Sequence, residues 1–318
     1  MKLGFVSDSL GGRSFAEMLD CAVALGVEGV EVNTGGWSTA PHFDLDAMQD
    51  PGARKAFQRA FSDRGLEIIS LNANGNPLHP TDAGQSHCLQ QTIRLAGEMG
   101  IKTVSAMSGL PAGAAGDKMP NWVVNAWPPE TQVILNHQWN DIAIPYWHDM
   151  VAFARECGVE RIALELHANQ LVFNVPSLLR LRQAVGPIIG ANLDPSHLFW
   201  MGADPLAAAE ALGKAVYHVH AKDTFLNAPV QATRSLLENG SLTDIPARAW
   251  SYVTLGFGHG EQWWRSFCYR LLMAGYDGWL AIEHEDVLLN SYEGLQKSVA
   301  LLKGVLPTEA PDYKLNDI

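Results

Sequence analysis

The chain has 318 residues, 47% of them hydrophobic, and a formal net charge of −12. This charge repels phosphate backbones, and lysine and arginine are scattered, so we expect no nucleic-acid partner. No apolar stretch approaches the roughly 20 residues of a membrane span, and the first residues lack a signal-peptide core. These features favour a cytoplasmic protein without a membrane partner. The four cysteines are widely spaced, which indicates free thiols rather than disulfides or zinc ligands.

Short apolar runs alternate with helical patterns along the whole chain. In chain order, the predicted strands are residues 3–7, 29–33, 67–72, 102–107, 161–166, 188–193, 215–220 and 279–283. The predicted helices are residues 14–25, 51–64, 85–100, 145–157, 176–184, 205–212, 262–274 and 292–303. Several helices begin at proline and several end at glycine, as the first helical turn and the C-terminal cap prefer. Eight such repeats without a break in composition predict one α/β domain over residues 1–318, a single (β/α)8 TIM barrel.

Two connections from a strand to the next helix are much longer than the usual two to six residues or so. Residues 108–144 follow the fourth predicted strand, and residues 224–261 follow the seventh. Both leave the C-terminal ends of strands, which is the face where TIM barrels carry their active sites. We therefore expect extended loops after strands 4 and 7 that form walls or lids of a site.

Four apolar runs in the second half of the chain each end in an acidic residue or a histidine. These residues are Glu165, Asp194, His220 and Glu283. In a barrel they would follow four successive strands and converge on one rim. Three carboxylates and one imidazole suit Mn²⁺, Mg²⁺ or a similar divalent ion. Because acidic residues at strand ends also cap the following helices, capping is the competing explanation for each of them.

The motifs around these residues resemble one known family. Glu-Leu-His at 165–167, Asp-Pro-Ser-His at 194–197, His-Ala-Lys-Asp at 220–223 and Ile-Glu-His-Glu at 282–285 are similar to those of the xylose isomerase-like TIM-barrel superfamily, especially its sugar phosphate isomerase/epimerase branch. The resemblance implies a divalent metal, often Mn²⁺ with Co²⁺, Mg²⁺ and Zn²⁺ as alternatives, held by Glu165, Asp194, His220 and Glu283. It also implies that Glu165 and Glu283 remove and return a proton next to a substrate carbonyl.

Other residues are candidates for contacts with the substrate. The resemblance gives His197 a contact with a substrate hydroxyl, and His167 should point toward the barrel mouth because it lies two positions after Glu165. Lys222 could bind substrate oxygens or pair with Asp223. His137 is a candidate auxiliary acid or base on the first long loop, where Trp139 could stack on a sugar, and His259 is a candidate on the second loop. Weaker candidates are Glu31, Asn72 and Asn74 at the substrate end and Glu285 behind a metal ligand.

Several reactions remain open at this point. A short basic, glycine-rich phosphate loop is absent from the sequence, which favours isomerisation or epimerisation of an unphosphorylated sugar or keto-sugar. The resemblance extends to C-glycoside deglycosidase large subunits, so a lyase that cleaves a C–C or C–O bond of a 3-oxo-glycoside is the alternative. An endonuclease IV-type enzyme is disfavoured by the charge and by missing histidines, and a non-enzymatic sugar-binding module would not need paired glutamates. Expected partners are a sugar or glycoside and either a homo-oligomer or a small second subunit.

Overall fold

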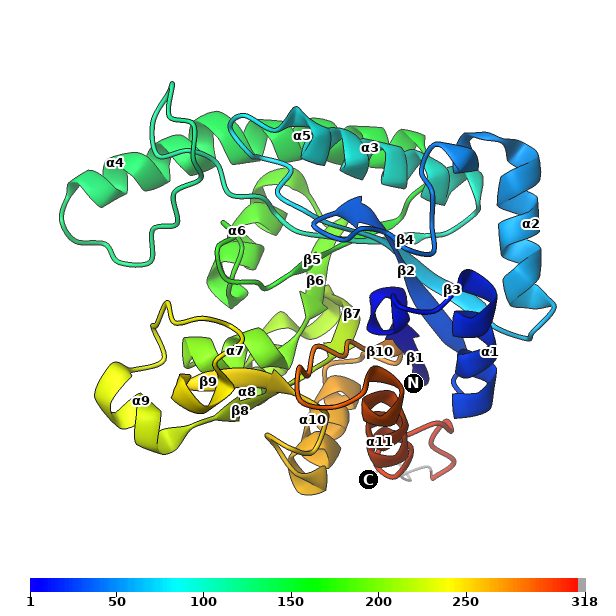
Figure 1. The fold of residues 1–318 in the computed structure, drawn as a ribbon. Coiled ribbons are helices and arrows are strands. Elements are labelled where there is room, and N and C mark those ends of the chain that lie inside the picture. Colours follow the sequence, from blue (N-terminus) through cyan, green and yellow to red (C-terminus); the bar gives the residue numbers. More distant parts are fainter. Residues whose placement is uncertain (314–318) are drawn as a thin grey trace, which may run out of the picture.

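Eight parallel strands form a closed barrel in the computed structural model, which describes residues 1–313 (Figure 1). The strands are β1 (Lys2–Val6), β2 (Gly29–Gly36), β3 (Glu67–Asn74), β4 (Thr103–Ala106), β5 (Arg161–Glu165), β6 (Ile189–Leu193), β7 (Val216–Ala221) and β10 (Trp279–Ile282). Around the barrel their order is β1-β10-β7-β6-β5-β4-β3-β2. The predicted single (β/α)8 barrel is confirmed, with strand ends that differ from the prediction by up to three residues.

The barrel is surrounded by helices that begin and end at the expected capping residues. They are α1 (Phe15–Leu25), α2 (Pro51–Ser62), α3 (Ala83–Glu98), α5 (Ile144–Glu156), α6 (Val175–Val185), α8 (Pro205–Leu212), α10 (Glu261–Met273) and α11 (Ser291–Lys303). The side chain of Ser14 accepts from the Glu17 amide at the start of α1, and Glu17 accepts from the Ser14 amide, which forms a reciprocal cap. Gly26 ends α1 in the left-handed conformation, at φ 65°.

The two long connections contain regular structure that the sequence analysis treated as loop. The first includes α4 (Glu130–Asn136) and a π-helical segment (His137–Ala143) that runs directly into α5. The second includes an antiparallel pair, β8 (Asp223–Leu226) with β9 (Trp250–Val253), and α9 (Ala228–Arg234). A short helix, α7 (Pro195–Met201), also follows β6 without having been predicted. Trp147 on α5 is fully buried and donates to the Ser108 carbonyl at 2.9 Å, so it anchors the start of the first connection.

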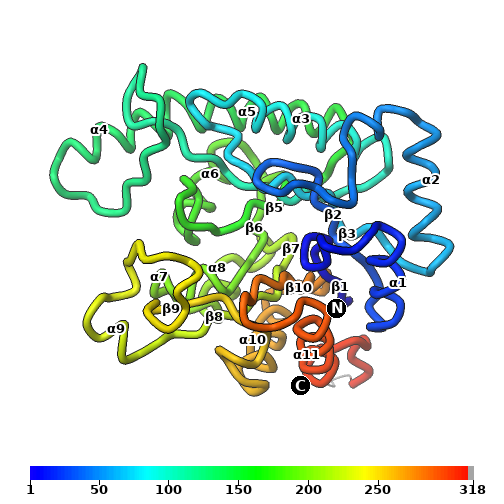
Figure 2. The backbone as a smooth tube through the Cα atoms, in the orientation of Figure 1, coloured from blue at the N-terminus to red at the C-terminus, as the bar shows by residue number. Residues whose placement is uncertain are grey.

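The two ends of the described chain lie beside each other. In Figure 2 the tube begins at β1 and returns past α11, which packs against α1. The N-terminal ammonium of Met1 donates to the Pro307 carbonyl at 2.9 Å. The pairing of β1 with β10 closes the barrel between its first and last strands.

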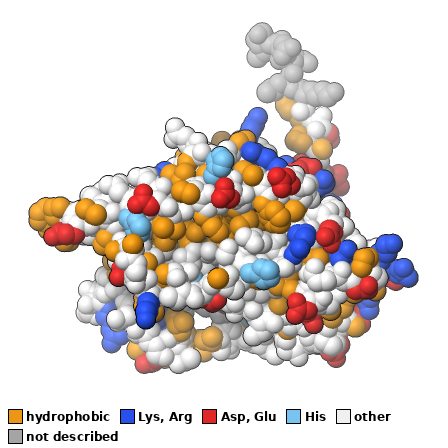
Figure 3. Space-filling model, turned by 90° about the horizontal axis from the view of Figure 1, so that it is seen from above, with side chains coloured by type: hydrophobic (Ala, Val, Ile, Leu, Met, Phe, Trp, Pro, Cys, Tyr) orange, Lys and Arg blue, Asp and Glu red, His pale blue; other side chains and the backbone are white. Residues whose placement is uncertain are grey.

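Apolar side chains gather on the face that carries α3, α4 and α5, which Figure 3 shows from above. On the first connection, Trp127 and Val133 are 73% and 70% exposed. This helical extension therefore presents apolar side chains to solvent as well as to the barrel. Within residues 1–313, the structure contains no helix with both the length and the hydropathy that a bilayer crossing requires.

Candidate metal centre and proton-transfer site

The four residues that end the apolar runs meet at the C-terminal rim of the barrel. Glu165 is the last residue of β5, Asp194 and Glu283 directly follow β6 and β10, and His220 lies near the end of β7. One ligand atom from each of them lies within 4.8 Å of the ligand atoms of the other three. Asp194 and His220 are fully buried, and Glu165 is 4% exposed. We call these four residues the carboxylate cluster.

Asp194 has two separate functions because its two oxygens face different ways. Oδ1 accepts from the Ser196 amide at 2.7 Å and so caps α7, where Pro195 occupies the first turn. Oδ2 is buried and has no hydrogen-bond partner among the described residues. Asp194 therefore caps α7 with Oδ1 and belongs to the cluster through Oδ2, which is a buried carboxylate oxygen that can bind a cation.

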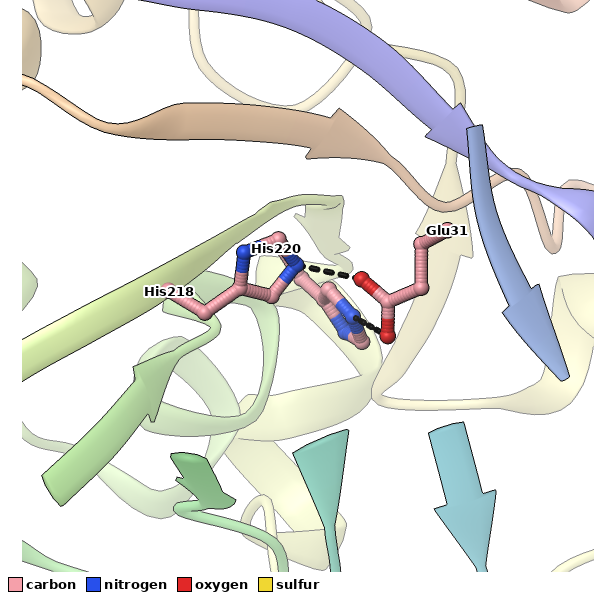
Figure 4. A group of neighbouring side chains, drawn as sticks. All are labelled: Glu31, His218 and His220. Atoms are coloured by element: carbon pink, nitrogen blue, oxygen red, sulfur yellow. Dashed lines mark hydrogen bonds and ion pairs between the residues drawn. The ribbon is translucent and has the colours of Figure 1, made fainter. Parts of the chain in front are cut away.

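His220 is oriented by a second carboxylate inside the barrel. Its Nε2 lies 3.2 Å from Oε1 of Glu31, which also accepts from Nδ2 of the Asn72 side chain at 2.7 Å. The other Glu31 oxygen is bonded to Nε2 of His218, and Figure 4 shows Glu31 facing both imidazoles. Burial alone would raise the pKa of Glu31, but His218 and His220 outweigh burial and hold it well below its usual range.

Because the ionised Glu31 only accepts, Nε2 of His220 carries a proton, and the opposite ring atom faces the cluster. This atom, Nδ1, is buried and has no hydrogen-bond partner in the described part of the chain. It lies 3.3 Å from Glu283 Oε2 and 3.7 Å from Glu165 Oε2. A carboxylate behind the imidazole and the other ring nitrogen directed at a group of carboxylates are the arrangement of histidine ligands in metal sites.

The carboxylate cluster fits a divalent cation. Two ligands on opposite sides of an ion, each about 2.2 Å away, are roughly 4.4 Å apart, which agrees with the spacing in the cluster. Two of the four side chains also have a buried ligand atom that makes no hydrogen bond among the described residues, Oδ2 of Asp194 and Nδ1 of His220. Three carboxylates and an imidazole are donors that Mn²⁺, Mg²⁺, Co²⁺ and Zn²⁺ all accept.

Lys222 is the cation that the chain itself places at the cluster. Its ammonium lies 2.6 Å from Glu283 Oε2, 3.3 Å from Asp194 Oδ2 and 3.2 Å from Glu285 Oε2. Pairing between Lys222 and Asp223, one of the two predicted possibilities, is wrong. Asp223 instead accepts from the amides of Gly256, Gly258 and His259 and holds that turn against β8.

The charges of the cluster set the protonation of its carboxylates. Burial alone would raise the pKa of Glu283, but Lys222 and His220 outweigh it and lower this pKa to about 2. Burial is likewise opposed at Asp194, where Lys222 and His197 hold the pKa below its usual range. At Glu285 burial prevails and keeps the pKa above its usual value. Glu283 and Asp194 are therefore ionised at neutral pH.

His197, His167 and Tyr252 line one side of the cluster. Nε2 of His197 lies 2.8 Å from Glu165 Oε1 and 3.3 Å from Asp194 Oδ2. Its Nδ1 is 2.9 Å from the Tyr252 hydroxyl, and its ring centre is 4.0 Å from that of His167. The structure thus brings the predicted residues His197, His167 and Lys222 to the cluster.

The candidates on the two long connections form other contacts. His137 Nδ1 is 2.9 Å from Asp141 Oδ2 within the same helical segment, and Trp139 is buried below the Arg180 guanidinium, which is 4.3 Å from its ring centre. His259 is 2.8 Å from Asp223 Oδ1 and stacks on Phe199 with the ring centres 3.7 Å apart. None of these contacts joins His137, Trp139 or His259 to the four cluster residues, so their predicted roles at the substrate gain no geometric support.

Comparison with known proteins identifies the family. A model of the xylose isomerase-like TIM barrel matches residues 19–305. The chain belongs to this family. The uncharacterized protein YfiH of Bacillus subtilis (strain 168) is 48% identical to this xylose isomerase-like barrel over 308 residues, which cover 95% of the chain and 98% of YfiH.

Solved structures share the xylose isomerase-like fold at low sequence identity. The IOLI protein with a bound zinc atom has a TM-score of 0.68 and 16% identity, and the match covers 96% of this chain and 98% of that chain. An L-ribulose 3-epimerase has a TM-score of 0.63 and 15% identity, with coverage of 96% and 94%. At these identities the likeness establishes the common fold.

Two residues of this xylose isomerase-like site were not found from the sequence. His218 could have been found, because it lies two positions before His220 and side chains two apart in a strand share a face. Tyr252 had no such signal, since it lies in a connection whose hairpin was not predicted. Glu31 was predicted at the substrate end of the pocket, but its contacts place it behind His220, within the barrel.

Proposed function

We propose that this protein is a divalent-metal-dependent enzyme that isomerises or epimerises an unphosphorylated sugar or keto-sugar. The proposal rests on the carboxylate cluster, in which Oδ2 of Asp194 and Nδ1 of His220 are buried and make no hydrogen bond among residues 1–313. Membership in the xylose isomerase-like family and the common fold with a sugar epimerase support it. A purely sugar-binding protein would have no use for three carboxylates placed around one point.

The residues of the chain would divide the work as follows. Glu165, Asp194, His220 and Glu283 would hold the ion, which supplies a Lewis acid that stabilises negative charge on substrate oxygens. Glu165 and Glu283 would remove and return the proton on the carbon next to the carbonyl. His197 contacts the first of these carboxylates and Lys222 the second, so each is oriented by a hydrogen-bond donor. Lys222 and His197 would also bind substrate hydroxyls, and Tyr252 orients His197.

One observation favours a second candidate, the lyase that acts on a 3-oxo-glycoside. His167 and Tyr252 also line a cavity, together with Trp200 of α7 and Trp250 of β9. Such a space would accommodate the group that departs when proton abstraction is followed by elimination. Abstraction of the proton by the same carboxylates is common to both reactions, so the two candidates differ only in the fate of the substrate.

A deuterium-exchange experiment tests the proposal. The protein loaded with Mn²⁺ is incubated in D₂O with a panel of ketoses, aldoses and 3-keto-glucosides, and the products are followed by NMR. Deuterium in an intact sugar supports isomerisation or epimerisation, whereas release of the aglycone supports the lyase. Glu165→Gln should abolish exchange and weaken Mn²⁺ binding, while Glu160→Gln, at an exposed ion pair with Lys102, should change neither. Full exchange by Glu165→Gln would refute the assigned proton transfer.

A further inference from the structure

A cavity of about 720 Å³ lies beside the carboxylate cluster, within the range of roughly 300–1,000 Å³ of small-molecule sites. Its walls come from the first long connection, the segment after β5, α7 and the second long connection, which includes β9 and residues 237–242. Three tryptophans line it: Trp122, Trp200 and Trp250. The second connection therefore builds a chamber that the barrel alone does not provide.

Two residues join this chamber to the cluster. His167 and Tyr252 line the chamber, and both contact His197: the His167 ring centre is 4.0 Å from that of His197, and the Tyr252 hydroxyl is 2.9 Å from Nδ1 of His197. His197 in turn lies 2.8 Å from Glu165. The Lys222 ammonium lies 4.7 Å from the centre of the Tyr252 ring. His167 and Tyr252 therefore belong both to the wall of the chamber and to the surroundings of the cluster.

The chamber contains polar atoms that the protein does not pair. Glu238 lines it with a side chain that is 5% exposed. Its Oε1 accepts from the Ala249 amide at 2.5 Å, but its Oε2 is buried and has no hydrogen-bond partner in the described chain, with Arg234 Nη1 3.9 Å away. The indole N–H of Trp122 is likewise buried without an acceptor among residues 1–313. One acceptor and one donor thus remain for a ligand.

The apolar wall of the chamber is already in place. Trp200 and Trp250 stack with ring centres 4.5 Å apart and an angle of 3° between their planes. The buried Arg248 lies 4.5 Å over Trp250 and donates to the Trp250 carbonyl at 3.0 Å and the Gly240 carbonyl at 2.9 Å. Indole surfaces bind the apolar C–H faces of ring compounds, and unpaired carboxylate oxygens accept from hydroxyls. Together they match a ring that has both an apolar face and hydroxyl groups.

We propose that the chamber is a second sugar subsite, so that the substrate is a glycoside whose second, hydroxyl-bearing ring lies against the tryptophans and donates to Glu238. This inference rests on the proposed function, because it takes the first ring to bind at the carboxylate cluster. It adds the substrate class: a sugar joined to a second sugar, rather than a free monosaccharide. An aryl group would use the tryptophans but would leave Glu238 unpaired.

Calorimetric titration of the Mn²⁺-loaded protein tests this subsite. The probes are cellobiose and lactose, compared with the methyl and phenyl β-glycosides of glucose and galactose. We expect at least one disaccharide to bind about tenfold more tightly than the matching methyl glycoside. Glu238→Gln keeps an acceptor for the Ala249 amide and should remove most of this gain, whereas Glu160→Gln should retain it.

Two results would overturn the proposal. One is that neither disaccharide binds more tightly than its methyl glycoside. The other is that the phenyl glycosides gain as much as the disaccharides and that Glu238→Gln has no effect, which would make the chamber a general apolar site. Titration with Mn²⁺ alone separates failure of this subsite from failure of the proposed function. If the protein did not bind Mn²⁺, the metal site at the carboxylate cluster would be refuted, and the preference for disaccharides could still be measured.

Discussion

Glu31 and His220 lie 189 positions apart in the sequence, yet Oε1 of one is 3.2 Å from Nε2 of the other inside the barrel. This hydrogen bond points Nδ1 of His220 at the carboxylate cluster. We predict that Glu31→Gln weakens Mn²⁺ binding by about 10- to 100-fold, because an amide no longer accepts from both imidazoles. Titration calorimetry measures the affinity. Ser105→Ala removes another buried polar contact of the barrel, with Ser70, and should leave Mn²⁺ affinity unchanged. An unaltered affinity in Glu31→Gln would show that His220 needs no such orientation.

Asp194 offers a way to separate helix capping from metal binding. Asn accepts a hydrogen bond at an N-cap about as well as Asp, but Ala does not. Asp194→Asn and Asp194→Ala should therefore lose Mn²⁺ affinity to a similar extent, while the free energy of unfolding should be about 1 kcal/mol lower for Ala than for Asn. Calorimetry and denaturant unfolding of the metal-free proteins provide the two measurements. Equal stabilities would mean that the bond to the Ser196 amide contributes little.

Lys222 and a divalent ion would share the same carboxylates, so their charges compete. We predict that Lys222→Met binds Mn²⁺ roughly tenfold more tightly, equivalent to about 1.4 kcal/mol, because a positive charge 2.6 Å from Glu283 is removed. The same variant should turn over substrate more slowly, since it lacks a donor for substrate oxygens. Lys102→Met, which removes an exposed ammonium, is the control for charge alone. Weaker Mn²⁺ binding by Lys222→Met would contradict this account.

His167 should make the stability of the metal-free protein depend on pH. Burial, and then the neighbouring His197, lower its pKa from 6.5 to about 4. Between pH 4 and 6.5, His167 is protonated in the unfolded chain but neutral in the folded protein. The contribution of neutral His167 to stability is therefore fully present above about pH 6.5 and is lost as the pH falls toward 4. Between pH 6.5 and 4 the unfolding free energy of His167→Gln should decrease less than that of the unaltered protein, and the difference should be at most roughly 3 kcal/mol. Unfolding by urea at several pH values measures it, with the exposed His148→Gln as the control. Equal slopes in all three proteins would exclude His167 as the source.

The sequence by itself determined the barrel and the rim of the candidate site. The apolar runs that end in Glu165, Asp194, His220 and Glu283 are local patterns. In a (β/α)8 barrel, strands that follow one another in the sequence are also adjacent in space, so these ends were expected to meet. The capping residues of the helices were visible for the same reason, because a cap depends on residues three or four positions apart.

Only the tertiary structure decided what lies behind and beside this rim. Glu31 meets His218 and His220 across the interior of the barrel, and Tyr252 reaches His197 from a hairpin inside a long connection. Neither contact follows from periodicity, since the first depends on side-chain length and packing across the barrel and the second on how an irregular segment folds back. Lys222 shows the same limit: its neighbour in sequence is Asp223, the first residue of β8, but its ammonium pairs with the carboxylates of Asp194 and Glu283, which directly follow β6 and β10.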